Sequence, residues 1–200
     1  KDKFRIIVKK NMAANAGLGG GSMNASTVIN FFLKKKLINV KREEIFKISK
    51  TVGSDVALGL FPNSKNLLLK SNGIIKTLPS KVKFHVLIVK PHFGCSTKKI
   101  YSKVKKFSKP KFGSTSKNIL SKEFLKKLNN DLEKIAINDH PKMKILKNFL
   151  ENLSNIEFVR MTGSGSAIIG YFNSVVMCKD AEKKVKKQFR NHWCKTSKTI

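Results

Sequence analysis

The sequence lacks long apolar runs and holds few cysteines, and both shortages exclude classes of protein. No apolar run in the 200 residues approaches the ~20 that a helix needs to span a bilayer. The three cysteines are widely spaced without a CxxC pair, so neither a disulfide framework nor a zinc site is indicated. The scattered histidines do not stand at metal-ligand spacing from cysteines or carboxylates. We therefore expect a cytoplasmic protein with no membrane partner and no metal site built from side chains alone.

Acidic residues and arginine are also scarce, whereas lysine is abundant. The formal net charge is +30, from 42 lysines and arginines against 12 aspartates and glutamates. Such a balance often marks a protein that binds nucleic acid or an anionic membrane. Arginine, whose planar fork favours bidentate recognition of phosphate and guanine, occurs only at Arg5, Arg42, Arg160 and Arg190. A Lys/Asn/Ile bias typical of a low-GC genome explains the charge, and we expect no specific nucleic-acid partner.

The pattern of apolar residues predicts two units, residues 1–80 and 83–200. In the first, we expect a strand over 4–8, helices over 22–36 and 43–49, and a hairpin over 66–78 that turns at Ser71-Asn72-Gly73. In the second, we expect strands over 84–89, 158–161, 167–172 and 193–200, a loop over 109–116, and helices over 97–107, 130–136, 141–153 and 181–189. Strands and helices alternate without a strict βαβ rhythm, which favours an α+β fold over a doubly wound sheet.

A glycine-rich segment, Ala16-Gly-Leu-Gly-Gly-Gly-Ser22, stands between the first predicted strand and the first predicted helix. Glycine lets a ligand approach the backbone closely, and the helix that follows directs its free N–H groups and positive dipole end into the loop. The segment is not a Walker loop, because no Gly-Lys-Ser/Thr follows, and it lacks the acidic residue of a dinucleotide fingerprint. A flexible linker is the plain alternative. The pattern favours a phosphate-binding loop.

A single carboxylate, Asp55, interrupts the apolar stretch over 52–60. Burying it would be costly unless it is paired or put to use. As a general base it could accept the proton of an attacking hydroxyl, as the aspartate of a kinase does. As a helix N-cap it would only bond backbone N–H groups, and its place after Gly-Ser and before an apolar run suits that too. The spacing alone leaves both roles open.

A second pair of glycines occurs in Gly163-Ser164-Gly165-Ser166, between two predicted strands. Glycines in such a place can form a tight turn and nothing more. They can also form a second backbone wall beside the phosphate loop. Taken alone, the segment does not decide between the two.

These three segments, in this order and at these separations, resemble the three motifs of the GHMP kinase superfamily, which includes galacto-, homoserine, mevalonate and phosphomevalonate kinases. The glycine-rich segment as it stands is more specific and resembles that of the 4-diphosphocytidyl-2-C-methyl-D-erythritol kinases of the non-mevalonate isoprenoid pathway. The resemblance covers essentially the whole chain. Its further supports are Val52-Gly-Ser-Asp-Val56, Val89-Lys-Pro-His-Phe-Gly-Cys-Ser-Thr97, Asn130-Asp-Leu-Glu133 and Met161-Thr-Gly-Ser-Gly-Ser166.

The resemblance implies a GHMP kinase fold, with a ribosomal protein S5 domain 2-like, ATP-binding part over 1–80 and a ferredoxin-like domain over 83–200. It implies an ATP- and Mg²⁺-dependent kinase, monomeric or homodimeric, that phosphorylates the 2-hydroxyl of a small-molecule substrate, 4-diphosphocytidyl-2-C-methyl-D-erythritol. It assigns deprotonation of that hydroxyl to Asp55 and the shaping of the site to Gly163, Ser164 and Gly165. The residues that it assigns to ATP are Ala13, Ala14, Asn15, Ala16, Gly17, Leu18, Gly19, Gly20, Gly21, Ser22 and Met23.

The chain departs from the family pattern in several places. Ala13 and Ala57 stand where the family has proline, and Met23 stands where it has a second serine. A thioether cannot replace an oxygen ligand for a hard cation such as Mg²⁺. The family's N-terminal strand, which bears a catalytic lysine, has no counterpart, and we expect it to precede Lys1. We accordingly expect little or no activity from these 200 residues alone.

Three other functions stay open at this point. The first is another GHMP kinase, acting on homoserine or a mevalonate derivative. The second is an inactive nucleotide-binding homologue, which Met23 and the two absent prolines suggest. The third is a basic nucleic-acid-binding protein, which would bind RNA with a steep salt dependence.

Overall fold

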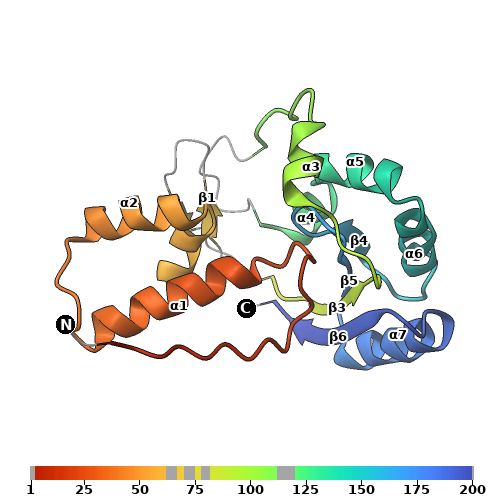
Figure 1. Ribbon diagram of the computed structural model, residues 1–200. Coiled ribbons are helices and arrows are strands. Elements are labelled where there is room, and N and C mark those ends of the chain that lie inside the picture. The colour runs from red at the N-terminus through yellow and green to blue at the C-terminus, as the bar shows by residue number, and fades with distance from the viewer. Residues whose placement is uncertain (1–2, 62–66, 70–74, 78–81, 112–119, 200) are drawn as a thin grey trace. The chain divides into compact units, whose positions relative to one another are not determined.

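The computed structural model describes residues 3–61, 67–69, 75–77, 82–111 and 120–199, in two compact units (Figure 1). The first unit comprises Lys1–Ala14 and Gly19–Ser64, and the second comprises Asn15–Leu18 and Lys65–Ile200. The glycine-rich segment is therefore divided, and its first half belongs to the second unit. The domain boundaries predicted at residues 80 and 83 stay a prediction.

The first unit is helical in its described part. It contains α1 (Gly20–Lys34), α2 (Arg42–Val52) and the short 3₁₀ helix η1 (Val56–Leu60), so both predicted helices are confirmed. Asn30 of α1 donates from Nδ2 to the carbonyl oxygen of Gly59 at 2.9 Å. A Cβ at Gly59 would lie only 1.9 Å from Oγ of Ser26, so this approach of η1 to α1 depends on glycine. The contact fixes the segment that follows Asp55 against α1.

The strand predicted over residues 4–8 is wrong. These residues form no strand, and none of the strands in the described part pairs with them. Ile6, Ile7 and Val8 are each more than half exposed, at 56%, 78% and 51%. Their β-branched pattern favours extended backbone, but a strand also needs a neighbouring edge to accept and donate its backbone hydrogen bonds.

The second unit is built on an antiparallel sheet. Its strands are β3 (His85–Lys90), β4 (Phe158–Met161), β5 (Ile168–Phe172) and β6 (Trp193–Lys198), in the spatial order β4-β5-β3-β6. Numbered along the chain, this order is second-third-first-fourth, which is the arrangement of a ferredoxin-like sheet. The α+β class and the ferredoxin-like C-terminal domain are thereby confirmed. A separate antiparallel pair, β1 (Leu67–Leu69) and β2 (Ile75–Thr77), confirms the hairpin, whose predicted turn lies outside the described residues.

The helices of the second unit are α3 (Thr97–Ser102), α4 (Lys122–Lys126), α5 (Asp131–Asp139), α6 (Lys142–Glu151) and α7 (Val175–Gln188). α3 ends at Ser102, earlier than predicted. α7 begins well before the predicted residue 181, because Oγ of Ser174 accepts the N–H of Val176 and caps the helix there. Of the predicted loop over 109–116, only residues 109–111 are described, and they form neither helix nor strand.

The hydrophobic core lies between one face of the sheet and the helices. Leu87 and Val89 alternate along β3 with residues that face the other way, as the period of two in a strand requires. Both are fully buried, and residues of α3, α5, α6 and α7 are buried with them. The core cluster comprises Leu87, Val89, Cys95, Ile100, Leu132, Ala136, Met143, Leu146, Leu150, Met161, Ile168, Phe172, Cys178, Ala181 and Val185.

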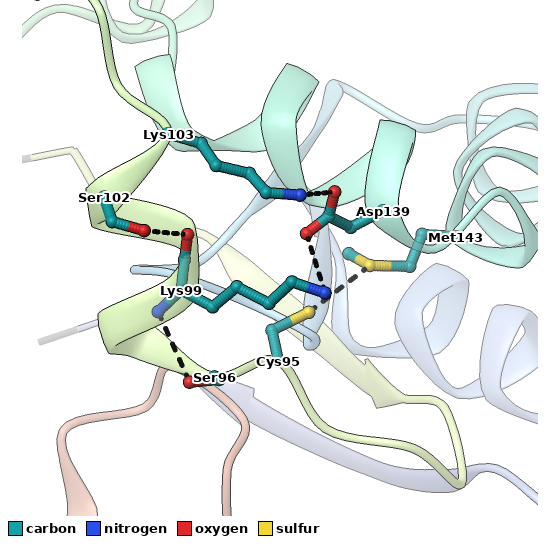
Figure 2. Close-up of polar contacts among 7 residues, drawn as sticks. All are labelled: Cys95, Ser96, Lys99, Ser102, Lys103, Asp139 and Met143. Carbon is teal, nitrogen blue, oxygen red and sulfur yellow. Dashed lines mark hydrogen bonds and ion pairs between the residues drawn. The ribbon is translucent and has the colours of Figure 1, made fainter.

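α3 is fastened to α5 by Asp139 (Figure 2). Nζ of Lys103 donates to Oδ1 of Asp139, and Nζ of Lys99 lies 3.7 Å from Oδ2. The hydrogen bond from Lys103 is the main reason why the pKa of Asp139 lies below its ordinary value. At the other end of α3, Oγ of Ser96 accepts the N–H of Lys99 at 3.3 Å. Two ion pairs and a cap therefore set the position of this short helix.

Replacing Asp139 by Asn should lower the thermal midpoint at neutral pH. A carboxylate whose pKa is lowered by folding stabilises the protein above its unfolded pKa, and this stabilisation is lost as the pH falls through the folded pKa. The difference between the Asp139→Asn variant and the parent should therefore shrink as the pH falls below the ordinary pKa range of aspartate and through the lowered pKa of Asp139. Circular dichroism melts at neutral and acid pH measure it. Asp180→Asn, which removes an exposed pair with Lys183, is the control and should change little; a pH-independent deficit in Asp139→Asn would contradict the account.

Candidate functional site

The first half of the glycine-rich segment lies against the Thr162–Ser166 segment, backbone on backbone. A Cβ at Gly17 would lie 2.2 Å from the carbonyl oxygen of Thr162 and 2.9 Å from the backbone nitrogen of Gly165. A Cβ at Gly163 would lie 2.7 Å from the carbonyl oxygen of Gly17. Gly17 and Gly163 also have positive φ, +69° and +50°, which side chains disfavour. The structure thus brings two of the three predicted segments into direct contact.

Two hydrogen bonds hold this contact in place. Oγ1 of Thr162 donates to the carbonyl oxygen of Gly17 at 3.1 Å. The N–H of Ala167 donates to the carbonyl oxygen of Ala16 at 3.2 Å, and Ala16 itself is buried. The first half of the loop is therefore fixed before any ligand arrives.

Asn130 supports the Thr162–Ser166 segment from the side. Its Nδ2 donates to the carbonyl oxygens of Met161 and Gly163, at 2.9 and 2.8 Å, and its Oδ1 accepts the N–H of Leu132 at 3.0 Å. One side chain thereby caps α5 and holds the carbonyl oxygens on either side of Thr162. Oε2 of Glu133 adds a bond from the N–H of Met161 at 2.7 Å.

The hydroxyl groups of Ser164 and Ser166 make hydrogen bonds within the protein. Oγ of Ser164 lies 2.8 Å from Oγ1 of Thr97, and Oγ of Ser166 donates to the carbonyl oxygen of Phe93 at 2.7 Å. Both serines are buried, at 5% and 0% exposure. Their contacts join the segment to the end of β3 and to the start of α3.

The second half of the glycine-rich segment has the opposite character. Gly19, with φ of +65°, precedes α1, and its carbonyl oxygen accepts the N–H of Met23 at 2.9 Å. The N–H groups of Gly20, Gly21 and Ser22 belong to the first helical turn, which has no intrahelical acceptors for them. A Cβ at Gly19, Gly20 or Gly21 would meet no atom of the described residues within 4 Å. This end of α1 is therefore open.

Asp55 lies in the same unit as this open end. A Cβ at Gly53 would lie 3.8 Å from Oγ of Ser22, which places Gly53, two residues before Asp55, beside the first turn of α1. Asp55 is exposed and occupies the N-cap position of η1, yet within the described residues its carboxylate makes no capping bond to that helix. Oγ of Ser54 donates to its Oδ1 at 3.2 Å. The carboxylate of Asp55 is therefore exposed, bonded to Ser54 and not used as a cap of η1.

The other predicted loop residues differ in their surroundings. Ala13 and Ala14 belong by their contacts to the first unit, apart from Asn15–Leu18. Met23 is 38% exposed, and its Cε would lie 3.2 Å from a Cβ at Gly59, so the thioether lies beside η1. Among the described residues, no group of three or more His, Cys, Asp or Glu side chains could hold a metal ion. None of the helices in the described ranges is long and apolar enough to cross a membrane.

Sequence reasoning missed the structural roles of Asn130 and Thr97. Asn130 stands before a helical pattern and is the N-cap of α5. Nothing local shows that its amide group also reaches Gly163, which is far away along the chain. Thr97 is similar, because its partner Ser164 comes from a distant turn.

Gly17→Ala should destabilise the protein, because it combines a clash with a backbone oxygen and a strained φ. We expect a loss of about 1–3 kcal/mol in the free energy of unfolding. Urea unfolding followed by circular dichroism measures it. Gly21→Ala, whose Cβ enters open space, is the matched control and should unfold at the same or a higher urea concentration. Equal stability of the two variants would show that the Gly17 contact is not tight.

The comparisons with known proteins agree with the fold. No family model matches the chain. A 4-diphosphocytidyl-2-C-methyl-D-erythritol kinase of Pelagibacter ubique is 52% identical over 198 residues, which cover 99% of this chain and 70% of that protein. The kinase of the same description from Clostridium tetani is 30% identical, over 100% of this chain and 72% of the relative. The chain spans 62% of a third such kinase, from Persephonella marina, at 32% identity over 84% of the chain.

Two solved structures share the fold. A crystal structure of 4-(cytidine 5'-diphospho)-2C-methyl-D-erythritol kinase matches with a TM-score of 0.70 at 23% identity, over 94% of this chain and 68% of that one. The homoserine kinase of Cytophaga hutchinsonii matches with a TM-score of 0.58 at 15% identity, over 96% of this chain and 68% of that one. At these identities the likeness concerns the fold, and it confirms the predicted GHMP kinase fold.

Proposed function

The chain belongs to the 4-diphosphocytidyl-2-C-methyl-D-erythritol kinase family, and on that premise we propose that it transfers the γ-phosphate of ATP to the 2-hydroxyl of 4-diphosphocytidyl-2-C-methyl-D-erythritol. The family membership supports a kinase of this type over a homoserine or mevalonate kinase. It also favours an enzyme over a nucleic-acid-binding protein. The reaction itself is argued below from the residues of the two glycine segments and Asp55.

The observation that carries the proposal is the open N-terminus of α1. Gly20 and Gly21 lie within the helix without positive φ, and a Cβ at either would meet no described atom within 4 Å. Each glycine inside a helix costs about 1 kcal/mol relative to alanine. Packing and backbone geometry therefore give no reason for glycine at these two positions. A phosphate that approaches the N–H groups closely does give one.

The anchored half of the loop supports the same interpretation. Asn15–Leu18 are held by Thr162 and Ala167, so the backbone that leads into α1 has a fixed starting point. Donors that are already oriented need no reorganisation when charge develops on the transferred phosphate, which is why such sites accelerate the reaction. The flexible linker considered above does not explain backbone contacts this close.

Asp55 is the proposed general base. Its carboxylate is exposed and is bonded to Ser54 without capping η1, and Gly53, two residues earlier, lies beside the first turn of α1. It would accept the proton of the substrate's 2-hydroxyl as the hydroxyl oxygen attacks the γ-phosphorus and ADP leaves. In this role Asp55 ends the step protonated and the phosphate ester carries the new P–O bond.

Mg²⁺ fits this donor set as the counter-ion of ATP. The hydroxyl of Ser22 is an oxygen donor of the kind that Mg²⁺ prefers, and the phosphates supply the others. Bound there, the ion would neutralise part of the phosphate charge. The side chain of Met23 offers no oxygen, so the chain would hold the ion with fewer hydroxyl groups than its relatives' Ser-Ser pattern provides.

The double variant Gly20→Ala/Gly21→Ala should bind Mg–ATP more weakly without loss of stability. Two methyl groups at the open end of α1 would block the approach of the phosphates, and we expect at least a tenfold rise in Kd, or about 1.4 kcal/mol. Isothermal titration calorimetry of the full-length protein measures the affinity. Asn24→Ala, one turn further along the same helix, should leave it unchanged. An unaltered Kd in the double variant would place the phosphates elsewhere.

Asp55→Asn should abolish phosphoryl transfer while Mg–ATP binding survives. Loss of a general base lowers kcat by roughly 10²–10⁴. The test is ADP formation by the full-length protein with 4-diphosphocytidyl-2-C-methyl-D-erythritol, beside calorimetric titration with Mg–ATP. Glu43→Gln, an exposed carboxylate in the first turn of α2, is the control and should keep full turnover. Normal turnover in Asp55→Asn would reduce Asp55 to a structural residue of η1.

A further inference from the structure

Lys90, the last residue of β3, is buried although it carries an ammonium group. It is 8% exposed, and its Nζ donates to the carbonyl oxygens of Pro91 and Phe93, both at 2.9 Å. These bonds close the chain into a turn directly after the strand. Burial lowers the pKa of Lys90, with a smaller opposing effect from Cys95. A buried cation costs free energy, and an apolar side chain of similar length would fill the same space.

The turn that Lys90 closes is also hydrogen-bonded to the Thr162–Ser166 segment. The carbonyl oxygen of Phe93 accepts from Nζ of Lys90 and also from Oγ of Ser166, at 2.9 and 2.7 Å. Ser166 is fully buried, and its neighbour Ala167 donates to Ala16 in the glycine-rich segment. One carbonyl oxygen therefore connects the end of β3 with the turn that holds Gly17.

The same turn touches the glycine-rich segment directly. Gly94 follows Phe93, and a Cβ at Gly94 would lie 2.7 Å from Cβ and 3.1 Å from the carbonyl oxygen of Asn15. Asn15 has φ of +51°, so the chain there is in a left-handed conformation that its surroundings must maintain. A displacement of the Pro91–Gly94 turn would reach Asn15 without an intervening side chain.

We infer that Lys90 is a positioning residue for the phosphate-binding loop, because its ammonium group fixes the turn that supports both Asn15 and Ser166. The inference deepens the proposed function and rests on it to the extent that this loop binds ATP. Lys90 touches no reacting atom in this role. Its effect passes through Phe93 and Gly94 to the loop.

The test is Lys90→Met, which removes the donor and keeps an unbranched side chain. Calorimetric titration of the full-length protein with Mg–ATP should show at least a tenfold rise in Kd. Leu150→Ala, in the buried face of α6, is the control for a general loss of stability, and its Kd should match that of the parent. Ser166→Ala removes the other donor to Phe93 and should raise Kd in the same direction, which keeps the test available if Lys90→Met does not fold.

Hydrogen exchange of the amides of Ala16–Leu18 without nucleotide gives a second readout. Exchange there should be faster in Lys90→Met than in Leu150→Ala, because only the first variant releases the turn. Equal exchange in the two, or an unchanged Kd in Lys90→Met and Ser166→Ala, would overturn the inference. If the parent protein itself binds no Mg–ATP, the proposed function fails, and the exchange comparison still decides the role of Lys90.

Discussion

The contact of two backbones, Gly17 against Thr162 and Gly163, is the constraint on which the rest of the site depends. Each glycine lies where a Cβ would overlap a carbonyl oxygen of the other segment. Residues with a Cβ could not approach this closely, but neighbouring side chains hold the contact in place. Thr162 bonds Gly17 from one side and Asn130 holds the carbonyl oxygen of Gly163 from another. The fold of the second unit is what brings these distant parts of the chain together.

This constraint divides the glycine-rich segment into two parts with different physical tasks. Asn15–Leu18 are packed and bonded, so their glycine is needed for the structure. Gly20 and Gly21 are in open space at the start of a helix, so their glycines are needed only if something approaches the backbone there. The N–H groups at the start of α1 are a suitable site for a phosphate. Gly53, two residues before the exposed Asp55, lies beside that same helix end.

Local patterns predicted the elements that depend on local physics. The apolar alternation of β3 and the helical periodicity of α1, α2, α5 and α6 were sufficient to locate them. Residues 4–8 show the limit, because their β-branched side chains favour a strand but cannot supply the neighbouring edge. α7 shows another limit of local patterns. Its lysine-rich part predicted a helix from residue 181, whereas the N-cap at Ser174 begins the helix at Val175.

The chemistry of the site was less accessible from sequence than the fold. Spacing left Asp55 open between base and cap, and only the resemblance to known kinases favoured the base. Asn130 and Lys90 could not be predicted, because their importance lies in hydrogen bonds to carbonyl groups. Every residue has a backbone carbonyl group, so no pattern of residue types marks which of these groups accept a hydrogen bond from a side chain. Only the folded chain shows that the carbonyl oxygens of Phe93 and Gly163 do so.

The most direct test of the account is a titration of the ¹⁵N-labelled full-length protein with Mg–ATP, followed by nuclear magnetic resonance of the backbone amides. The central claim is that the N–H groups at the start of α1 bind the phosphates. It predicts that the largest chemical-shift changes occur at the amides of Gly19, Gly20, Gly21 and Ser22. The titration curve of these changes should give the same Kd as calorimetry. Changes confined to other elements, with these four amides unmoved, would contradict it.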